Sequence, residues 1–422
     1  MSTIQGFTRE SVLTLSAALG EPEWLLAKRL EAFEAFSQTP YPDTRSDEDW
    51  RRCDLRRVDF DALANIATPN GAVSTASGAE DAVGVATFVD GTLVDQRLSD
   101  ELAAAGVVLT SLHAALAEHG ELIRRHFMTH CVQPGEGKFT LLHAAFFNQG
   151  LFCYVPRGVK VDGSLLVQVE LGGGALLHHS LVVVDDDASV SLVEEYRSGD
   201  QVAGLSVPVT EIIAGRGAQV VYAGVQAWGG KVIEVGTKRV LAGPDAQVSF
   251  CTGHLGGKLS KEFIGAALAG SGSSVDLLGI TFPGAGQHID QTTVQDHRVP
   301  NCHSDLKFMG AVGDRGRSVF RGVINVHPAA QQTDAYQKNE NLLLGDKART
   351  DSMPVLEILA DDVKCSHGAS LSHLDSEVLF YLMARGLPRA EAQRMMVAGF
   401  FEPVIDQVPV ESVRARLQQA VA

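Results

Sequence analysis

The spacing of hydrophobic residues changes twice along this chain and divides it into three regions. Up to about residue 150, apolar residues recur mainly every third or fourth position, as on one face of a helix. The clearest case is 21–36, where Pro22 can open a helix. A strand at 107–112 leads into a helical run that ends near Phe127, and the small polar residues 68–78 predict a loop. We therefore predict a mixed, mainly helical N-terminal region at 1–150.

Between about residues 151 and 360, short runs of Val, Leu and Ile alternate with turns rich in Gly and Asp. One element recurs there, namely a polar turn, one or two small residues, and a valine that opens an apolar run. The valines are Val190, Val220, Val248 and Val275, which are 30, 28 and 27 residues apart, with a weaker copy at Val319. A near-constant period of strands and turns is typical of a solenoid. We predict a mainly β fold whose core is a right-handed parallel β-helix at 151–360, with the four valines stacked in register and buried.

A β-sandwich is the structural alternative to the solenoid, because it also produces regular strands and turns.

After residue 360 the pattern becomes helical again, since Asp375 can cap a helix that Gly386 ends, Pro388 can open a second helix, and 410–421 can form a third. We predict a C-terminal helical domain at 361–422, which either covers the exposed last coil of the solenoid or presents a surface to a partner.

Composition and charge narrow the classes of partner. The formal charge is −16, with 45% hydrophobic and 20% charged residues, so a large core is available. An acidic surface repels phosphate backbones and anionic lipid, which argues against nucleic acid and membranes as partners. The chain lacks the apolar segment of a signal peptide and any apolar run of about 18 residues, so we expect it in the cytoplasm. The six cysteines form no C-x-x-C pair, which favours reduced thiols.

The motifs of a self-contained enzyme are missing. Residues 253–259 come closest to a P-loop, but they lack its first glycine and the hydroxyl that should follow Lys258. We find no G-x-G-x-x-G after a strand, no G-x-S-x-G and no H-E-x-x-H. Glu194 and Glu195 would face opposite sides of a strand, unlike the paired carboxylates of a glycosidase. We therefore expect a protein that is not an enzyme; a carbohydrate-active β-helix enzyme or a stand-alone homo-oligomeric β-helix protein are the alternatives.

Residues suited to soft metals gather in two places. The first is the stretch 288–303, whose side chains equally fit ordinary turn or core positions; they are His288, Asp290, His297, Cys302 and His303. The second is Cys365 with His367, which would point to the same face of a strand. Thiolate and imidazole suit iron and iron–sulfur centres. Because two ligands are too few to close a site, the pair suggests one that another subunit completes.

The sequence around this pair resembles the SufB/SufD family of iron–sulfur cluster assembly proteins. The similarity covers essentially the whole chain apart from about 68–80; its segments are 21–26, 287–290, 317–320, 333–337, 341–344, 356–369, 379–382 and 385–386. SufB-type chains carry a cysteine just before the Leu-Leu-Gly run and Glu-His-Glu around the histidine. This chain has Lys-Asn-Glu-Asn at 338–341 and Ser-His-Gly at 366–368, so it is similar to the SufD type.

The resemblance implies a complex of SufB, SufD and two copies of the SufC ATPase, in which the β-helices pair and the C-terminal helices dock the ATPases. It implies that His367 lies at the interface with SufB and takes part in cluster assembly, with Cys365 beside it. The nascent iron–sulfur cluster would be shared with SufB and transient. No catalytic residue is expected, and a reduced flavin has no support in the sequence. An isolated chain could pair with a second copy of itself.

Overall fold

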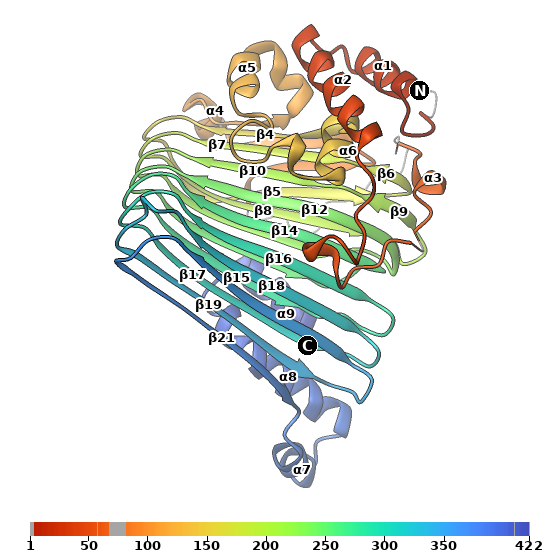
Figure 1. Cartoon of the computed structure of the whole chain (residues 1–422), viewed down its shortest axis with the longest axis vertical. Helices are drawn as coiled ribbons and strands as arrows, with labels where there is room; N and C mark the ends of the chain where they lie inside the picture. The colour runs from red at the N-terminus through yellow and green to blue at the C-terminus, as the bar shows by residue number, and fades with distance from the viewer. Residues whose placement is uncertain (1–3, 57, 67–81, 409, 422) are drawn as a thin grey trace.

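Two long sheets of parallel strands form the centre of the computed structural model (Figure 1), which describes residues 4–56, 58–66, 82–408 and 410–421. The loop predicted at 68–78 lies outside these ranges. The first sheet has the order β2 (Thr92–Leu98), β1 (Ala82–Val89), β5 (Lys160–Leu171), β8 (Ser189–Ser198), β11 (Gln219–Ala227), β13 (Gln247–His254), β15 (Ser274–Thr281), β17 (His303–Val312), β19 (Thr333–Leu343) and β21 (Val363–His373).

The second sheet faces the first across a shared core. Its order is β20 (Arg349–Ile358), β18 (Arg317–Val326), β16 (His288–His297), β14 (Leu259–Leu268), β12 (Lys231–Ala242), β10 (Val209–Ala214), β7 (His178–Val184), β4 (Gln149–Val155) and β3 (Val108–Ser111), with the short β6 (Gly174–Leu176) and β9 (Ala203–Ser206) at its side. From β4 onward the chain passes from one sheet to the other, and neighbouring strands pair in parallel. This arrangement confirms the parallel β-solenoid and excludes the sandwich, whose strands pair antiparallel.

The predicted valine register is confirmed. Val220 pairs with Val190 on one side and Val248 on the other, and Val248 pairs with Val275. All four side chains are at most 3% exposed. The weaker copy at Val319 is not part of this ladder, because it lies on β18 in the second sheet.

Tight turns explain why Asp and Gly recur before each valine strand. Three residues ahead of each valine the backbone has a positive φ, which L side chains rarely adopt and which Gly, Asp and Asn tolerate best. These residues are Asp187 (φ 57°), Gly217 (61°), Asp245 (56°) and Gly272 (79°). Asn301 (61°) and Gln332 (57°) continue the series into later coils. One turn conformation is therefore repeated coil after coil, which keeps the register constant.

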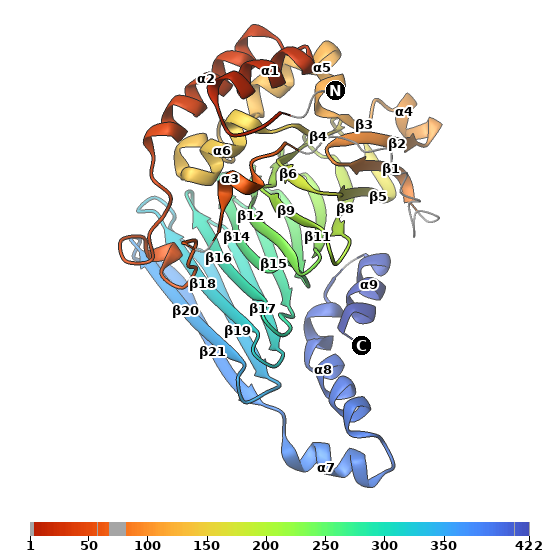
Figure 2. The ribbon, with the colours of Figure 1, turned by 90° about the vertical axis from the view of Figure 1, so that its right-hand side faces the viewer.

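A layer of helices covers the outer face of the second sheet at its first coils (Figures 1 and 2). It contains α1 (Arg9–Leu19), α2 (Glu23–Gln38), α3 (Phe60–Leu63), α5 (Leu112–His126), η2 (Pro134–Glu136) and α6 (Lys138–Phe146), while α4 (Asp100–Ala104) lies nearer the first sheet. The short η1 (Glu48–Trp50) lies over later coils, where Trp50 contacts Phe263 on β14 and Asp49 pairs with Arg321 on β18. The buried Arg29 joins α2 to α6, since it pairs with Glu21 at 2.6 Å and donates to the carbonyl oxygen of Ala145 at 3.0 Å. The helix predicted at 21–36 corresponds to α2, and the strand at 107–112 to β3.

Three helices follow the solenoid: α7 (Ser376–Ala384), α8 (Arg389–Ile405) and α9 (Glu411–Val421). As predicted, the Asp375 side chain caps α7 by accepting from two backbone amides, and Pro388 directly precedes α8. The helices do not cover the last coil. Helix α7 lies beyond the end of the solenoid, and α8 and α9 fold back along the outer face of the first sheet (Figure 2). There Phe401 of α8 packs in one cluster with Cys251 and Met309. An amphipathic pattern states which face of a helix is buried, but not which surface buries it.

In the described part of the chain, no helix is both long and apolar enough to cross a membrane.

Candidate functional site at the open end of the solenoid

Cys365 and His367 both lie on β21, which extends the solenoid to His373. Parallel pairing places Cys365 beside Ala335 and His367 beside Gln337. Traced back through the sheet, the Cys365 position continues the ladder of buried valines. The His367 position continues the ladder that begins Leu192, Tyr222, Phe250, Leu277 and Leu306. Both side chains therefore share the face of β21 that corresponds to the interior of the preceding coils.

The two side chains differ in their surroundings. His367 is exposed, whereas Cys365 is half-buried and packs against a small apolar cluster that includes Ala335 and Ala360. Burial raises the pKa of the Cys365 thiol, and the nearby charge of Asp334 adds to the effect. The sulfur is therefore a protonated thiol at neutral pH, and it would become a strong ligand only by losing its proton to a bound metal.

Exposed strand edges and apolar side chains surround the pair. Among the described strands, β20 and β21 end the two sheets, with 10 and 11 residues respectively, so each has one edge without a neighbouring strand. Apolar side chains are exposed on the same coils; they are Tyr336 (36%), Leu356 (36%), Ile358 (36%), Leu359 (68%) and Leu371 (57%). Long edge strands with exposed apolar side chains are templates for pairing with another chain.

The stretch 288–303 does not assemble into one site. His288 and His297 are the two ends of β16, and a strand of this length separates them by about 30 Å. Asp290 is held by the Lys261 ammonium at 2.7 Å, and His297 lies 2.8 Å from the Ser304 hydroxyl. Within the described residues, no three His, Cys, Asp or Glu side chains are arranged to hold a metal ion. All six cysteines are free thiols.

A network of ionisable side chains that the sequence patterns did not predict lies inside the solenoid. Glu194 accepts hydrogen bonds from Tyr222 at 2.6 Å and Thr210 at 3.1 Å, and it is fully buried. Glu262 contacts Lys238 and lies 2.6 Å from His254 Nε2. Although burial acts to raise it, the neighbouring His254 and Lys238 hold the pKa of Glu262 at about 2. The sequence did contain an indication of this network, because polar residues occupy inward positions of strands that are otherwise apolar.

Glu194 and Glu195 face opposite sides of β8, as predicted. Glu194 is inside the coil, whereas Glu195 is partly exposed and accepts from Gln168 at 3.0 Å. The pair therefore lacks the geometry of two carboxylates that flank one sugar bond.

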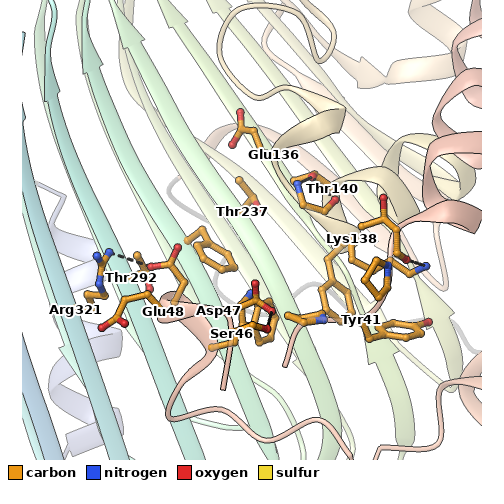
Figure 3. A pocket seen from close by; sticks show the side chains of 18 of the residues that line it. Tyr41, Ser46, Asp47, Glu48, Glu136, Lys138, Thr140, Thr237, Thr292 and Arg321 are labelled. Carbon is orange, nitrogen blue, oxygen red and sulfur yellow. Dashed lines mark hydrogen bonds and ion pairs between the residues drawn. The ribbon is translucent and has the colours of Figure 1, made fainter. Parts of the chain in front are cut away.

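A cavity of about 540 Å³ lies between the segment that follows α2 and the outer face of the second sheet (Figure 3). Two ion pairs cross it, Arg321 with Asp49 at 2.9 Å and Arg239 with Glu136 at 2.7 Å. Lys138 donates to the carbonyl oxygens of Phe36 and Thr39. The ion pairs that line this cavity thus hold the N-terminal layer on the solenoid.

The fold and its open end define a class of protein: a parallel β-solenoid with a helical N-terminal layer, helices packed on its flank, and a histidine and a cysteine on its last strand. Comparison with known families places the chain within that class. Residues 167–400 match the family described as "SUF system FeS cluster assembly, SufBD core domain", and residues 16–169 match the "SufBD protein N-terminal region". The chain therefore belongs to the SufBD family and is a component of iron–sulfur cluster assembly.

Curated relatives agree with this assignment. The chain is 28% identical to the iron–sulfur cluster assembly protein SufB of Bacillus subtilis, over 96% of this chain and 90% of the relative. It is 28% identical to an iron–sulfur cluster assembly SufBD family protein of Staphylococcus saprophyticus and 27% identical to one of Staphylococcus aureus, with the same coverage. These relatives do not separate the SufB type from the SufD type.

Proposed function

We propose that this chain is the SufD-type, non-catalytic scaffold subunit of a cytoplasmic SufBCD complex. Its open solenoid end pairs with a SufB-like subunit, its C-terminal helices dock a SufC-like ATPase, and His367 takes part in assembling the nascent cluster at the SufB-like interface. The observation that carries the proposal is the position of His367 and Cys365 on one accessible face of the last strand, next to unpaired strand edges.

The residues before the Leu-Leu-Gly run support the SufD type over the SufB type. Asn339 and Asn341 occupy inward positions on β19, where Asn341 donates to the Asn339 side-chain oxygen at 2.6 Å. Both are buried amides. An amide cannot supply the thiolate that SufB-type chains have in this stretch.

Exposed apolar side chains on α7 support docking of the ATPase by the C-terminal domain. The exposed residues are Val378 (44%), Phe380 (72%), Tyr381 (56%) and Met383 (39%), with Met395 (51%) on α8. Apolar side chains gathered in this way mark protein interfaces. Met396 and Phe400 are partly buried, and Phe400 packs against the cluster that holds α8 on the sheet. We therefore assign binding of the SufC-like ATPase mainly to α7 and to Met395 on α8.

Replacing Phe380 with Asp should weaken capture of the SufC-like ATPase by at least about tenfold, because it places a charge at the centre of the apolar patch. The measurement is a quantitative pull-down from co-expressed, purified subunits. Leu13→Asp is the matched control, since Leu13 is also an exposed apolar residue of a helix (38% exposed) but lies on α1. Undiminished capture by Phe380→Asp would move the docking surface away from α7. A point variant is sharper than deletion after Asp375, which would uncover the apolar flank of the first sheet.

The proposal as a whole is tested by co-expressing the chain with SufB-like and SufC-like subunits and loading the purified assembly anaerobically with iron and sulfide. We expect a stable complex that turns brown and transfers clusters to an apo-acceptor. A chain that purifies as a homo-oligomer and takes up no cluster with either partner would favour the alternative of a stand-alone β-helix protein.

A further inference from the structure

A second pocket, of about 590 Å³, lies where the N-terminal segment reaches the last coils of the solenoid. Figure 2 shows the segment between α2 and α3 beside β18 and β20. This segment contributes Arg51 and Arg52, and the first residues of β18 and β20 contribute Arg317 and Arg349. Residues almost 300 positions apart in the sequence thus form one wall.

The pocket is strongly basic in a chain whose formal charge is −16. Its lining holds four arginines and a single carboxylate, Asp351. Asp351 is shared, since one oxygen lies 3.1 Å from Arg317 Nη2 and the other 3.6 Å from Arg52 Nε. The remaining excess of positive charge favours an anion with more than one negative charge.

The other two arginines are available to a ligand. Within the described residues, Arg51 has one ion-pair partner, Glu48 at 3.4 Å, and both side chains are about 60% exposed. Such exposed pairs contribute little to stability. Arg349 is exposed and has no ion-pair partner among the described residues. Both guanidinium groups can therefore turn toward a bound anion at small cost.

A buried donor gives a second, independent indication of a ligand. Arg317 Nε is buried without a hydrogen-bond partner in the described part of the chain. An unsatisfied buried donor is unfavourable, and a hydrogen bond from it to an anion would relieve that cost. The pKa of His288, which pairs with Arg317 in the sheet, falls to about 4, chiefly because the ring is buried, and the charges of Arg317 and Lys261 add to the effect.

We propose that this pocket binds the phosphate group of a small phosphorylated molecule, either free phosphate or diphosphate, or its ester. Guanidinium groups bind phosphate oxygens in a bidentate manner, and several arginines match a multiply charged anion better than one carboxylate. A small molecule fits better than an acidic segment of a partner, because a volume of about 590 Å³ is typical of a small-molecule site. Leu343 and Leu371 form an apolar wall that can contact the non-phosphate part of an ester.

The occupant would tie the N-terminal segment to the last coils, because Arg51 and Arg52 come from one and Arg317 and Arg349 from the other. The site does not depend on the cluster role proposed above. Arg349 lies on β20 and Leu371 on β21, the two end strands, but anion binding is measured on the chain alone, without a partner subunit or cluster, so the two proposals fail separately.

The test is titration of the full chain with inorganic pyrophosphate at constant ionic strength, followed by calorimetry and by intrinsic tryptophan fluorescence, to which Trp50 beside Arg51 contributes. We expect saturable binding that is at least about tenfold weaker in Arg349→Gln, an exposed position that should not affect folding. Arg157→Gln, an exposed arginine on an early coil, is the matched control and should bind as the parent does. Inorganic phosphate and glycerol phosphate, titrated in parallel, distinguish a free anion from an ester.

Equal binding in the two variants, or binding no tighter than that of sulfate at the same ionic strength, would overturn the proposal. So would binding of a glutamate-rich peptide under conditions where pyrophosphate does not bind, because the basic wall would then be a docking surface for an acidic chain.

Discussion

Replacing Val220 with Asp is expected to unfold the solenoid under conditions where the parent chain is folded. Val220 is 2% exposed and lies between Val190 and Val248, so a carboxylate there would have only apolar neighbours in its ladder. Burying an unpaired charge costs about 4 kcal/mol or more, which is a large share of the stability of most proteins. Thermal and urea unfolding, followed by far-ultraviolet circular dichroism, measure the loss.

Two controls separate charge from position and size. Gln219→Asp introduces the same carboxylate one residue earlier, at an exposed position of β11, and should have little effect. Val220→Ala removes volume without adding charge and should cost about 1–3 kcal/mol. A Val220→Asp chain that melts within a degree or two of the parent would be incompatible with the buried valine ladder.

Replacing His367 with Ala is expected to abolish cluster formation by the complex while leaving the fold intact. A neutral imidazole can donate a lone pair to iron and a methyl group cannot, and the side chain is exposed, so the chain loses no core packing. Anaerobic reconstitution of the co-expressed complex, followed by visible absorbance and transfer to an apo-acceptor, measures the effect. Cys365→Ser should be milder, because under the proposed function the thiol, which is protonated at rest, would be only a secondary ligand.

His373→Ala is the matched control for this experiment. His373 is exposed on the same strand and, six residues further on, lies on the same face as His367. The complex with His373→Ala should assemble clusters as the parent complex does, and both variants should keep the melting temperature of the parent. If the intact His367→Ala complex assembles and transfers clusters at the parent rate, His367 is only an interface residue.

The core of the solenoid could be predicted from the sequence because two local rules repeat in the four coils that contain β8, β11, β13 and β15. A residue that tolerates positive φ ends each turn, as at Asp187 and Asp245, and an apolar residue three positions later enters the core. The end of the solenoid was harder to place. On β21 both faces are largely exposed, so residues 363–373 lack the buried pattern that marks the earlier strands.

The candidate pair on β21 could be recognised because its spacing of two residues is a local feature. The arginine pocket could not, since Arg51 and Arg349 are distant in sequence and meet only through the folding of the N-terminal segment onto the last coils. The same holds for Glu262 with Lys238 and His254, which come from different strands. Long-range proximity of charges follows from topology, and no local pattern encodes it.

The helices that fold back along the first sheet also determine how the solenoid comes apart. A free stack of coils can fray from its end, one coil at a time, because each coil contacts only its neighbours. Here α8 packs against both β15 and β17, and the same apolar cluster reaches Leu342 on β19. The coils that α8 and this apolar cluster hold together must open together. The strands β20 and β21 contribute no residue to that cluster. Amide hydrogen exchange should therefore be slow and cooperative through β17 and fast in the last coil, where local opening leaves the rest of the stack intact.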